Sequence, residues 1–396
     1  MRVNRFLAAG VLAASGVALL GVQPAGASTT SPIDLGVLPG GAESKAVDIS
    51  ETGVVVGEAT TAGGQTHAVR WGADHAISQL GTVPGSTWST AVDINAAGTA
   101  IIGVAQVSGQ RIPVRWDADG VVTALPLLPG GVTGGVAAVN AAGVTVGYSF
   151  AADGRSHAVK WAADGTVTDL GGLPSGSYPL GEPMVRGHAS SINDAGAVVG
   201  EVYPADAVEH AVRWDASGAI SELGAPGASS GERARARFVN GAGQVVGTFR
   251  TTSGPSVPVR WTGAGASELN LAGRYLSELV GLSETGVVAG NAVVGRWLYL
   301  GLTWDANGQL TELPPLAGDV SSRAVDVIGD GSVVGNSSSA GETDRPVRWT
   351  GGVAQLLGAP AGATSASVYG ANDGGTAVGL AVLPGFVAHA VLWPAS

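Results

Sequence analysis

The sequence predicts an all-β fold, specifically an eight-bladed β-propeller with four-stranded antiparallel blades. Three observations support this: a high Gly and Pro content, a recurring Trp, and short apolar segments separated by turn residues. The 396 residues include 64 Gly and 20 Pro. Because Gly and Pro cost roughly 1 and 3 kcal/mol in a helix interior, all-helical and doubly wound α/β folds are excluded. Hydrophobic residues make up 45% of the chain and charged residues 13%, which excludes a disordered chain.

Internal repetition sets the number of blades. Eight segments of similar sequence end in Trp, about 45 residues apart: Trp71, Trp116, Trp161, Trp214, Trp261, Trp304, Trp349 and Trp393. Each copy also has a short apolar stretch between two glycines, as at Gly196 and Gly200, and an Asn-x-x-Gly turn recurs at residues 95–98, 140–143, 193–196 and 240–243. Four short strands in a repeat of this length are typical of a propeller blade.

The two ends of the repeat region complement each other. Residues 32–36 match residues 167–171, but no Trp segment precedes them, and no such segment follows Trp393. We therefore expect the N-terminal strand to complete the last blade beside residues 389–393, so that no sheet edge is left open. Residues 28–396 are predicted to form a single, monomeric propeller domain.

Residues 1–27 have the features of a secretory signal peptide. Arg2 and Arg5 precede an apolar run over residues 6–22, and Ala25-Gly26-Ala27 supplies a small-residue cleavage site. The alternative is a retained anchor helix, but the run is shorter than the roughly 20 residues that a membrane span needs. We expect a secreted, extracellular protein whose mature chain is not inserted in a membrane. With no Cys, the chain has no disulfide and no thiolate metal site.

The charge balance limits the class of partner. The formal net charge is −11, and nucleic-acid binding depends on cationic surfaces that displace counterions. We therefore expect no nucleic-acid partner.

Two sequence patterns resemble a known family. The first is H-A-V-R-W or H-A-V-K-W, at residues 67–71, 157–161 and 210–214, and the second is I-N-D-A-G-A-V-V-G at residues 192–200. They resemble the HAF-type extracellular repeat of secreted bacterial proteins, over residues 32–393. Val stands where that family has Phe, and Pro113, Pro258 and Pro346 replace the His. The resemblance implies export and a repeat architecture, and it implies no particular activity.

The charged residues of the repeat are expected to be structural. The motif histidines, His67, His157, His210 and His389, fall in separate blades, so we expect hydrogen bonding and neither a metal site nor a cofactor. A cation precedes most of the tryptophans: Arg70, Arg115, Lys160, Arg213, Arg260 and Arg348. We expect these cations to pair across blades with carboxylates on strands, such as Asp34, Asp169, Glu222, Glu268 and Glu312. The alternative is that the cations bind a ligand. The acidic turns at residues 117–120 and 305–308 have too few oxygen ligands for a calcium loop.

The longest gap between motif tryptophans, between Trp161 and Trp214, contains an insertion at residues 175–187. A basic cluster follows in the next repeat. Together with aromatic residues of nearby segments, these positions form the candidate ligand site: Trp88, Tyr178, Arg186, His188, Tyr203, Arg233, Arg235 and Arg237. Either the insertion is drift and the Arg alternation is the polar face of a strand, or the loops form a binding surface whose arginines orient a carboxylate or sulfate.

The sequence contains no specific catalytic constellation. It has no G-x-S-x-G motif on an expected strand-to-helix turn, which is the setting of the nucleophile in serine hydrolases. We expect a non-catalytic extracellular binding or scaffold module for a glycan or a protein. The alternative is a carbohydrate-active enzyme, a hydrolase or lyase, with its site at one end of the propeller channel. A purely structural surface protein is a third class that the sequence does not separate from the first.

Overall fold

The computed structural model describes residues 30–173, 186–203, 208–224, 233–250, 254–263, 265–295, 298–341 and 343–395. These residues form 32 β-strands in eight four-stranded antiparallel sheets, so the predicted eight-bladed, all-β propeller class is confirmed. The predicted signal peptide, residues 1–27, lies outside the described residues. In the part of the chain that the structure describes, no helix is long and apolar enough to span a membrane.

The chain divides into two compact units, and the first spans Leu80–Leu269. It contains four blades. The second blade comprises β6 (Ser86–Ile94), β7 (Ala100–Val107), β8 (Gln110–Asp117) and β9 (Val122–Ala124). The third comprises β10 (Gly134–Val139), β11 (Thr145–Phe150), β12 (Ser156–Trp161) and β13 (Val167–Asp169). The fourth comprises β14 (Arg186–Ile192), β15 (Val198–Tyr203), β16 (His210–Trp214) and β17 (Ile220–Glu222), and the fifth β18 (Arg233–Val239), β19 (Val245–Arg250), β20 (Ser256–Thr262) and β21 (Gly265–Glu268).

The second unit contains the other four blades, within residues 30–79 and 270–395. The first blade comprises β2 (Ser44–Ile49), β3 (Val55–Thr60), β4 (Thr66–Trp71) and β5 (Ile77–Gln79). The sixth comprises β22 (Tyr275–Leu282), β23 (Val288–Val293), β24 (Tyr299–Trp304) and β25 (Leu310–Leu313). The seventh comprises β26 (Ser321–Val327), β27 (Val333–Ser338), β28 (Asp344–Thr350) and β29 (Val353–Leu356), and the eighth β30 (Ser365–Ala371), β31 (Ala377–Leu383), β32 (Val387–Trp393) and β1 (Ile33–Asp34).

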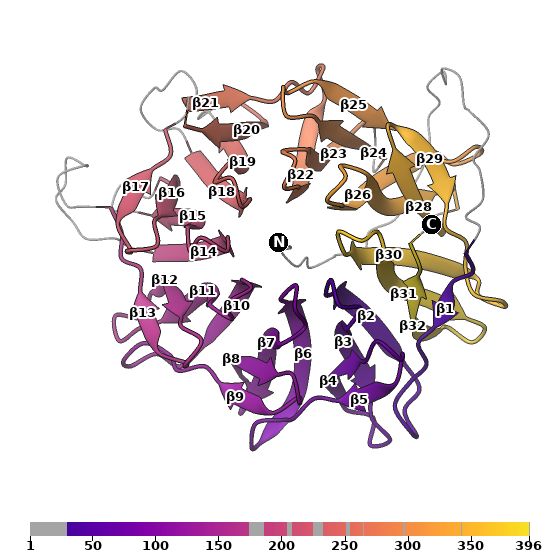
Figure 1. The fold of residues 1–396 in the computed structure, drawn as a ribbon, viewed down its shortest axis with the longest axis horizontal. Coiled ribbons are helices and arrows are strands. Elements are labelled where there is room, and N and C mark those ends of the chain that lie inside the picture. Colours follow the sequence, from indigo (N-terminus) through magenta and orange to yellow (C-terminus); the bar gives the residue numbers. More distant parts are fainter. Residues whose placement is uncertain are drawn as a thin grey trace. The chain divides into compact units, whose positions relative to one another are not determined.

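The N-terminal strand completes the eighth blade, as the sequence predicts. In β1, Ile33 and Asp34 pair with Leu392 and Val391 of β32, and Figure 1 shows the indigo β1 beside the yellow β32. The backbone N–H of Leu35 then donates to the carbonyl of Ala390 at 2.9 Å. These bonds tie one end of the repeat region to the other.

The motif tryptophans anchor the connections between strands. In seven blades the buried indole Nε1–H donates to a backbone carbonyl in the connection that leads into its own blade, at 2.6–2.9 Å: Leu35, Gly81, Pro126, Gly224, Asn270, Pro314 and Gly358. Each ring thus contributes apolar area to the core and satisfies its polar N–H at the same time.

A glycine in the second strand of each blade lets the first strand bulge toward it. At Gly200, an added Cβ would lie 2.0 Å from the carbonyl oxygen of His188, and at Gly247 it would lie 1.9 Å from that of Arg235. The register of the first strand shifts directly after these positions, between Ala189 and Ser191 in the fourth blade. Such close backbone approach requires Gly.

The turn asparagines connect neighbouring blades within each unit. The side-chain Oδ1 of Asn193 accepts from the backbone N–H of Ala197 at 2.9 Å, which closes its own turn. Its Nδ2 donates to the carbonyl of Asn240 in the next blade, also at 2.9 Å. Three other turns repeat the inter-blade bond at 3.0–3.3 Å: Asn95 to Ala141, Asn140 to Asn193, and Asn372 to Ser50. The predicted positive φ of the turn glycine is confirmed, as at Gly196 with φ 81°.

Deletion of residues 31–36 is expected to lower the melting temperature followed by circular dichroism. The deletion removes the outer strand of the eighth blade and the acceptor of the Trp71 indole, so it exposes the edge of β32. Asp34→Asn is the matched control, because it keeps the backbone pairing and should lower the melting temperature less. A deletion variant as stable as the full chain would contradict the role assigned to this strand.

Candidate functional site

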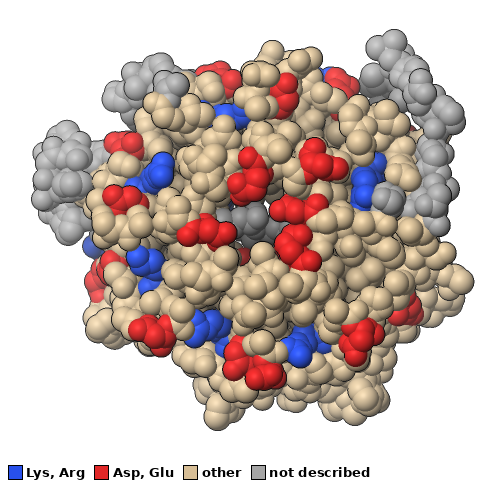
Figure 2. Space-filling model, viewed as in Figure 1, with Lys and Arg blue, Asp and Glu red and all other residues tan. Residues whose placement is uncertain are grey.

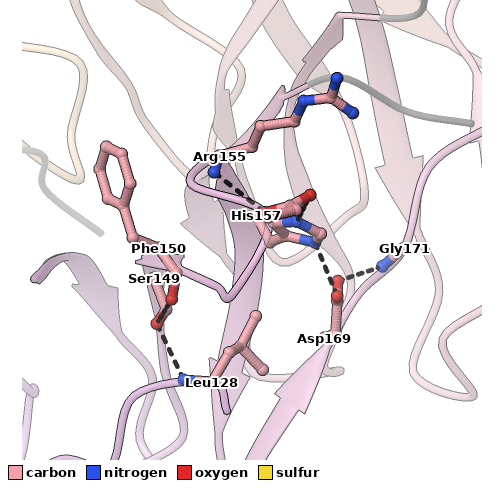
Figure 3. Close-up of polar contacts among 8 residues, drawn as sticks. Leu128, Ser149, Phe150, Arg155, His157, Asp169 and Gly171 are labelled. Carbon is pink, nitrogen blue, oxygen red and sulfur yellow. Dashed lines mark hydrogen bonds and ion pairs between the residues drawn. The ribbon is translucent and has the colours of Figure 1, made fainter. Parts of the chain in front are cut away.

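The motif histidines hold the outer strand of their blade. His157 Nδ1 lies 2.8 Å from Asp169 Oδ2 on β13, and His157 Nε2 lies 3.1 Å from Asp153 Oδ2 (Figure 3). The pairing recurs between His210 and Glu222 at 2.6 Å and between His389 and Asp34 at 2.9 Å. The expected hydrogen-bonding role is confirmed for these three histidines. Among the described residues, no group of three or more His, Asp or Glu side chains could hold a metal ion.

The expected pairing of the motif arginines with strand carboxylates is wrong at Asp34, Asp169, Glu222 and Glu312. Asp34, Asp169 and Glu222 bind histidines of their own blade, and Glu312 pairs with Arg274, which is not a motif arginine. Two motif arginines act between blades by donating to turn carbonyls: Arg115 donates to Gly143 and Ala163, and Arg348 donates to Gly375. The His lies on the strand that pairs with the outer strand, as His157 does beside Asp169. The carboxylate therefore has its partner within its own blade.

The predicted site residues fall into three groups. Arg186, His188, Tyr203, Arg233, Arg235 and Arg237 lie on β14, β15 and β18. Trp88 lies on β6 in the second blade, and in the described part of the chain it makes no ring contact or side-chain hydrogen bond with the other six. Tyr178 lies outside the described residues. The structure thus brings together the fourth- and fifth-blade residues and leaves Trp88 apart.

A polar cluster joins the third, fourth and fifth blades, and we call it the inter-blade cluster: Tyr148, His188, Glu201, Tyr203, Glu209 and Arg235. At its centre, the buried Glu209 carboxylate accepts from the Tyr203 hydroxyl and forms an ion pair with Arg235. The Nε of Arg235 is buried and has no hydrogen-bond partner among the described residues. The fifth blade is therefore held to the fourth by a charged contact.

The other half of the cluster surrounds His188. Its ring packs edge-on against Tyr148 of the third blade, with ring centroids 5.1 Å apart. Its Nδ1 lies 3.7 Å from Glu201 Oε1 on the neighbouring strand, and Glu201 accepts a hydrogen bond from Ser190 at 3.4 Å. His188 is 38% exposed while Glu201 is only 8% exposed, so the imidazole is the accessible member of the pair.

Burial and ion pairing fix the protonation states at the centre of the cluster. Burial, together with the hydrogen bond to Glu209, raises the pKa of Tyr203 to about 12. Burial alone would raise the pKa of Glu209, but the hydrogen bonds from Arg235 and Tyr203 and the charge of Arg233 hold it below its usual value. The bond to Glu209 raises the pKa of Arg235. At neutral pH, Tyr203 is protonated and Glu209 and Arg235 are charged.

Exposed cations border the cluster. Arg186 lies opposite Tyr203 in the strand register, and Arg233 lies opposite Arg250. Arg186 and Arg233 are both exposed, and neither forms an ion pair with a carboxylate among the described residues, although the charge of Arg233 lowers the pKa of Glu209. The chain has 31 acidic and 20 basic residues, and Figure 2 shows side chains of both signs on the face drawn. Against this background, the four arginines on β14 and β18 make a local basic region.

Sequence reasoning missed Tyr148, Glu201 and Glu209. A comparison among repeats could have found the first two, because both directly follow the glycine that admits the bulge, Gly147 and Gly200. Tyr148 at this position contacts His188 on the first strand of the next blade, whereas Glu201 contacts His188 and Ser190 of its own blade. Asn336, which follows Gly335, shows the same placement by bonding both backbone groups of Val368.

No protein-family model and no curated protein matches the chain. Solved structures of similar fold include a puromycin-hydrolysing peptidase of Mycobacterium tuberculosis, with 13% identity and a TM-score of 0.54 over 91% of this chain and 61% of that chain. A prolyl endopeptidase has 10% identity and a TM-score of 0.56 over 86% and 54%. A puromycin hydrolase has 16% identity and a TM-score of 0.49 over 94% and 62%. This chain thus spans less than two thirds of each enzyme, and the likeness shows the fold alone.

Replacement of Glu209 by Gln is expected to change how stability depends on pH. Because the pKa of folded Glu209 is depressed, its carboxylate stabilises the fold above the ordinary Glu value of 4.5, and this stability is lost as the pH falls through the folded pKa. Melting temperatures from pH 6 to pH 3 should therefore fall less steeply in Glu209→Gln than in wild type. Glu268→Gln, at an exposed position, is the control. Equal slopes in wild type and Glu209→Gln would contradict the assigned ion pair.

Proposed function

We propose that the protein is an exported, non-catalytic binding module of the HAF-repeat type, and that its ligand contacts the inter-blade cluster. The observation that carries this proposal is the arrangement of charge. Buried carboxylates fix Arg235 and face His188, while Arg186 and Arg233 stay exposed at the border. Such a rigid, preorganised base with exposed cations at its border suits a ligand that carries carboxylate or sulfate groups.

The protonation states favour binding over acid–base catalysis. A glycoside hydrolase needs a carboxylic acid with a raised pKa to protonate the leaving group, whereas the pKa of Glu209 is lowered. A tyrosine that serves as a base must ionise, whereas the pKa of Tyr203 is about 12. Both groups are therefore suited to hold hydrogen bonds at neutral pH and are poorly suited to transfer protons.

The enzyme alternative, a carbohydrate-active hydrolase or lyase, has a direct test. The purified protein is incubated with uronate-containing and neutral polysaccharides. We expect no new reducing ends and no unsaturated products, and either product would favour the enzyme. Export is tested separately: the secreted protein should begin at Ser28, after cleavage behind Ala27.

Removal of the two exposed cations is expected to weaken ligand binding without loss of fold. Arg186→Gln combined with Arg233→Gln should reduce binding to sulfated or uronate-bearing glycans and to acidic secreted proteins by about tenfold or more, because charge-assisted hydrogen bonds contribute roughly 1.5–3 kcal/mol each. Binding is measured on a glycan array and by pull-down, followed by titration calorimetry with each hit.

The control is Arg155→Gln, which removes one positive charge from an exposed turn of the same unit. It should leave binding unchanged. Equal binding by the double variant and wild type would show that the assigned site is wrong, and wild type that binds nothing in either screen would contradict the binding module.

A further inference from the structure

The sixth blade departs from the repeat in a way that the other blades do not. Its third strand, β24, reads Y-L-G-L-T-W, where other blades have H-A-V-R-W or a close variant. The motif His is absent, and Thr303 replaces the cation before the Trp. Aromatic and apolar side chains occupy this end of the blade instead, which changes the chemistry that its surface offers.

A row of three side chains crosses the sixth blade. Tyr275 of β22 lies opposite Val293 of β23, and Val293 lies opposite Tyr299 of β24. Directly opposed residues of antiparallel strands share one face of a sheet, so both tyrosines and the valine lie on the same face. Tyr275 is 65% exposed. A tyrosine this exposed gains little from burial, so packing does not explain its presence.

Charged groups of the seventh blade and of β22 border this row. The Arg323 guanidinium lies over the Tyr299 ring, 5.0 Å from its centroid. It is held there by Glu278, whose Oε1 accepts from Arg323 Nε at 3.1 Å and from Nη2 at 2.8 Å, and also from Asn291 Nδ2 at 3.1 Å. Arg323 keeps 30% of its side chain exposed, so the side chain is accessible to a ligand.

We propose that this row, Tyr275, Val293 and Tyr299 with Arg323, is a second binding site, and that it takes a neutral saccharide chain. The C–H face of a sugar ring stacks on an exposed aromatic ring, and the hydroxyls bind planar polar groups such as guanidinium and carboxylate. Tyr275 and Tyr299 are two strand spacings apart, about 10 Å, which is long enough for two consecutive sugar rings. Tyr275 stacks the first ring, and Arg323 donates to hydroxyls of the second.

This site is independent of the inter-blade cluster. It lies in the other unit, its aromatic side chains are not bordered by an excess of cations, and Arg323 is neutralised by Glu278. A ligand without charge therefore fits it better than the anionic ligand of the inter-blade cluster.

The experiment is affinity electrophoresis of the full chain in native gels that contain laminarin, soluble xylan, galactomannan or hydroxyethyl cellulose. Wild type should be retarded by at least one of these neutral polysaccharides. Tyr275→Ala should raise the dissociation constant obtained from the retardation about tenfold, as expected for the loss of one stacked ring. Tyr275 is exposed, so the fold does not depend on its ring, and circular dichroism verifies the fold of the variant.

Two further variants keep the result specific. Phe386→Ala removes another exposed aromatic side chain of the same unit, 90% exposed, and should be retarded as strongly as wild type. Arg186→Gln with Arg233→Gln should also be retarded normally, which separates this site from the inter-blade cluster. The proposal is overturned if wild type is retarded by none of the four polysaccharides, or if Tyr275→Ala and Phe386→Ala behave alike.

Discussion

The two-sided hydrogen bonding of the turn asparagines is the constraint on which the rest of the structure depends. Each of these amides closes its own turn through Oδ1 and reaches the next blade through Nδ2, as Asn193 does toward Ala197 and Asn240. A blade on its own is a small sheet with little core, and it buries its apolar faces only against its neighbours. The asparagine bonds fix the register in which those faces meet.

Because buried backbone and Trp contacts supply the frame, the positions that face neighbouring blades are free to vary. The position directly after the bulge glycine shows this variety. Tyr148 packs its ring against His188, Glu201 places a carboxylate near His188, and Asn336 donates to the carbonyl of Val368. Different chemistry is thus introduced without change to the strands. The inter-blade cluster includes two of these residues, Tyr148 and Glu201, whereas the proposed site of the sixth blade uses other positions.

The sequence predicted the blade number from Trp and Gly markers that repeat eight times, the turn chemistry from an Asn-x-x-Gly pattern that recurs in several blades, and the closing strand from the complementary ends of the repeat region. The pairing partners were harder to predict. His157 and Asp169 are 12 residues apart and meet only through the β12–β13 register, so the carboxylate was assigned to an arginine instead. Glu209 was missed for a similar reason: its importance comes from Arg235, 26 residues away in another blade, and no motif marks it.

The candidate site was predicted in part. The Arg alternation on β18 and the insertion before β14 pointed to the fourth and fifth blades, and a ligand site there stays a prediction. Arg235 of this set is a structural cation, and Trp88 lies on the second blade. The sixth blade went unnoticed because it was judged by its Trp and Gly markers, which it retains. Its loss of the motif His and cation was visible in residues 299–304 and was the available signal.

The most direct test of the asparagine bonds is the free energy of unfolding of Asn193→Asp, measured by urea denaturation. The substitution keeps an oxygen to close the turn and removes the N–H that reaches the Asn240 carbonyl. A buried acceptor left without its donor costs about 1–3 kcal/mol, and because Asn193 is only 3% exposed the new carboxylate is buried as well. Asn193→Asp should therefore be destabilised by at least that amount. Asn307→Asp, in a turn where the structure gives that side chain no inter-blade bond, should stay within about 0.5 kcal/mol of wild type. Equal stability of the two variants would contradict the account.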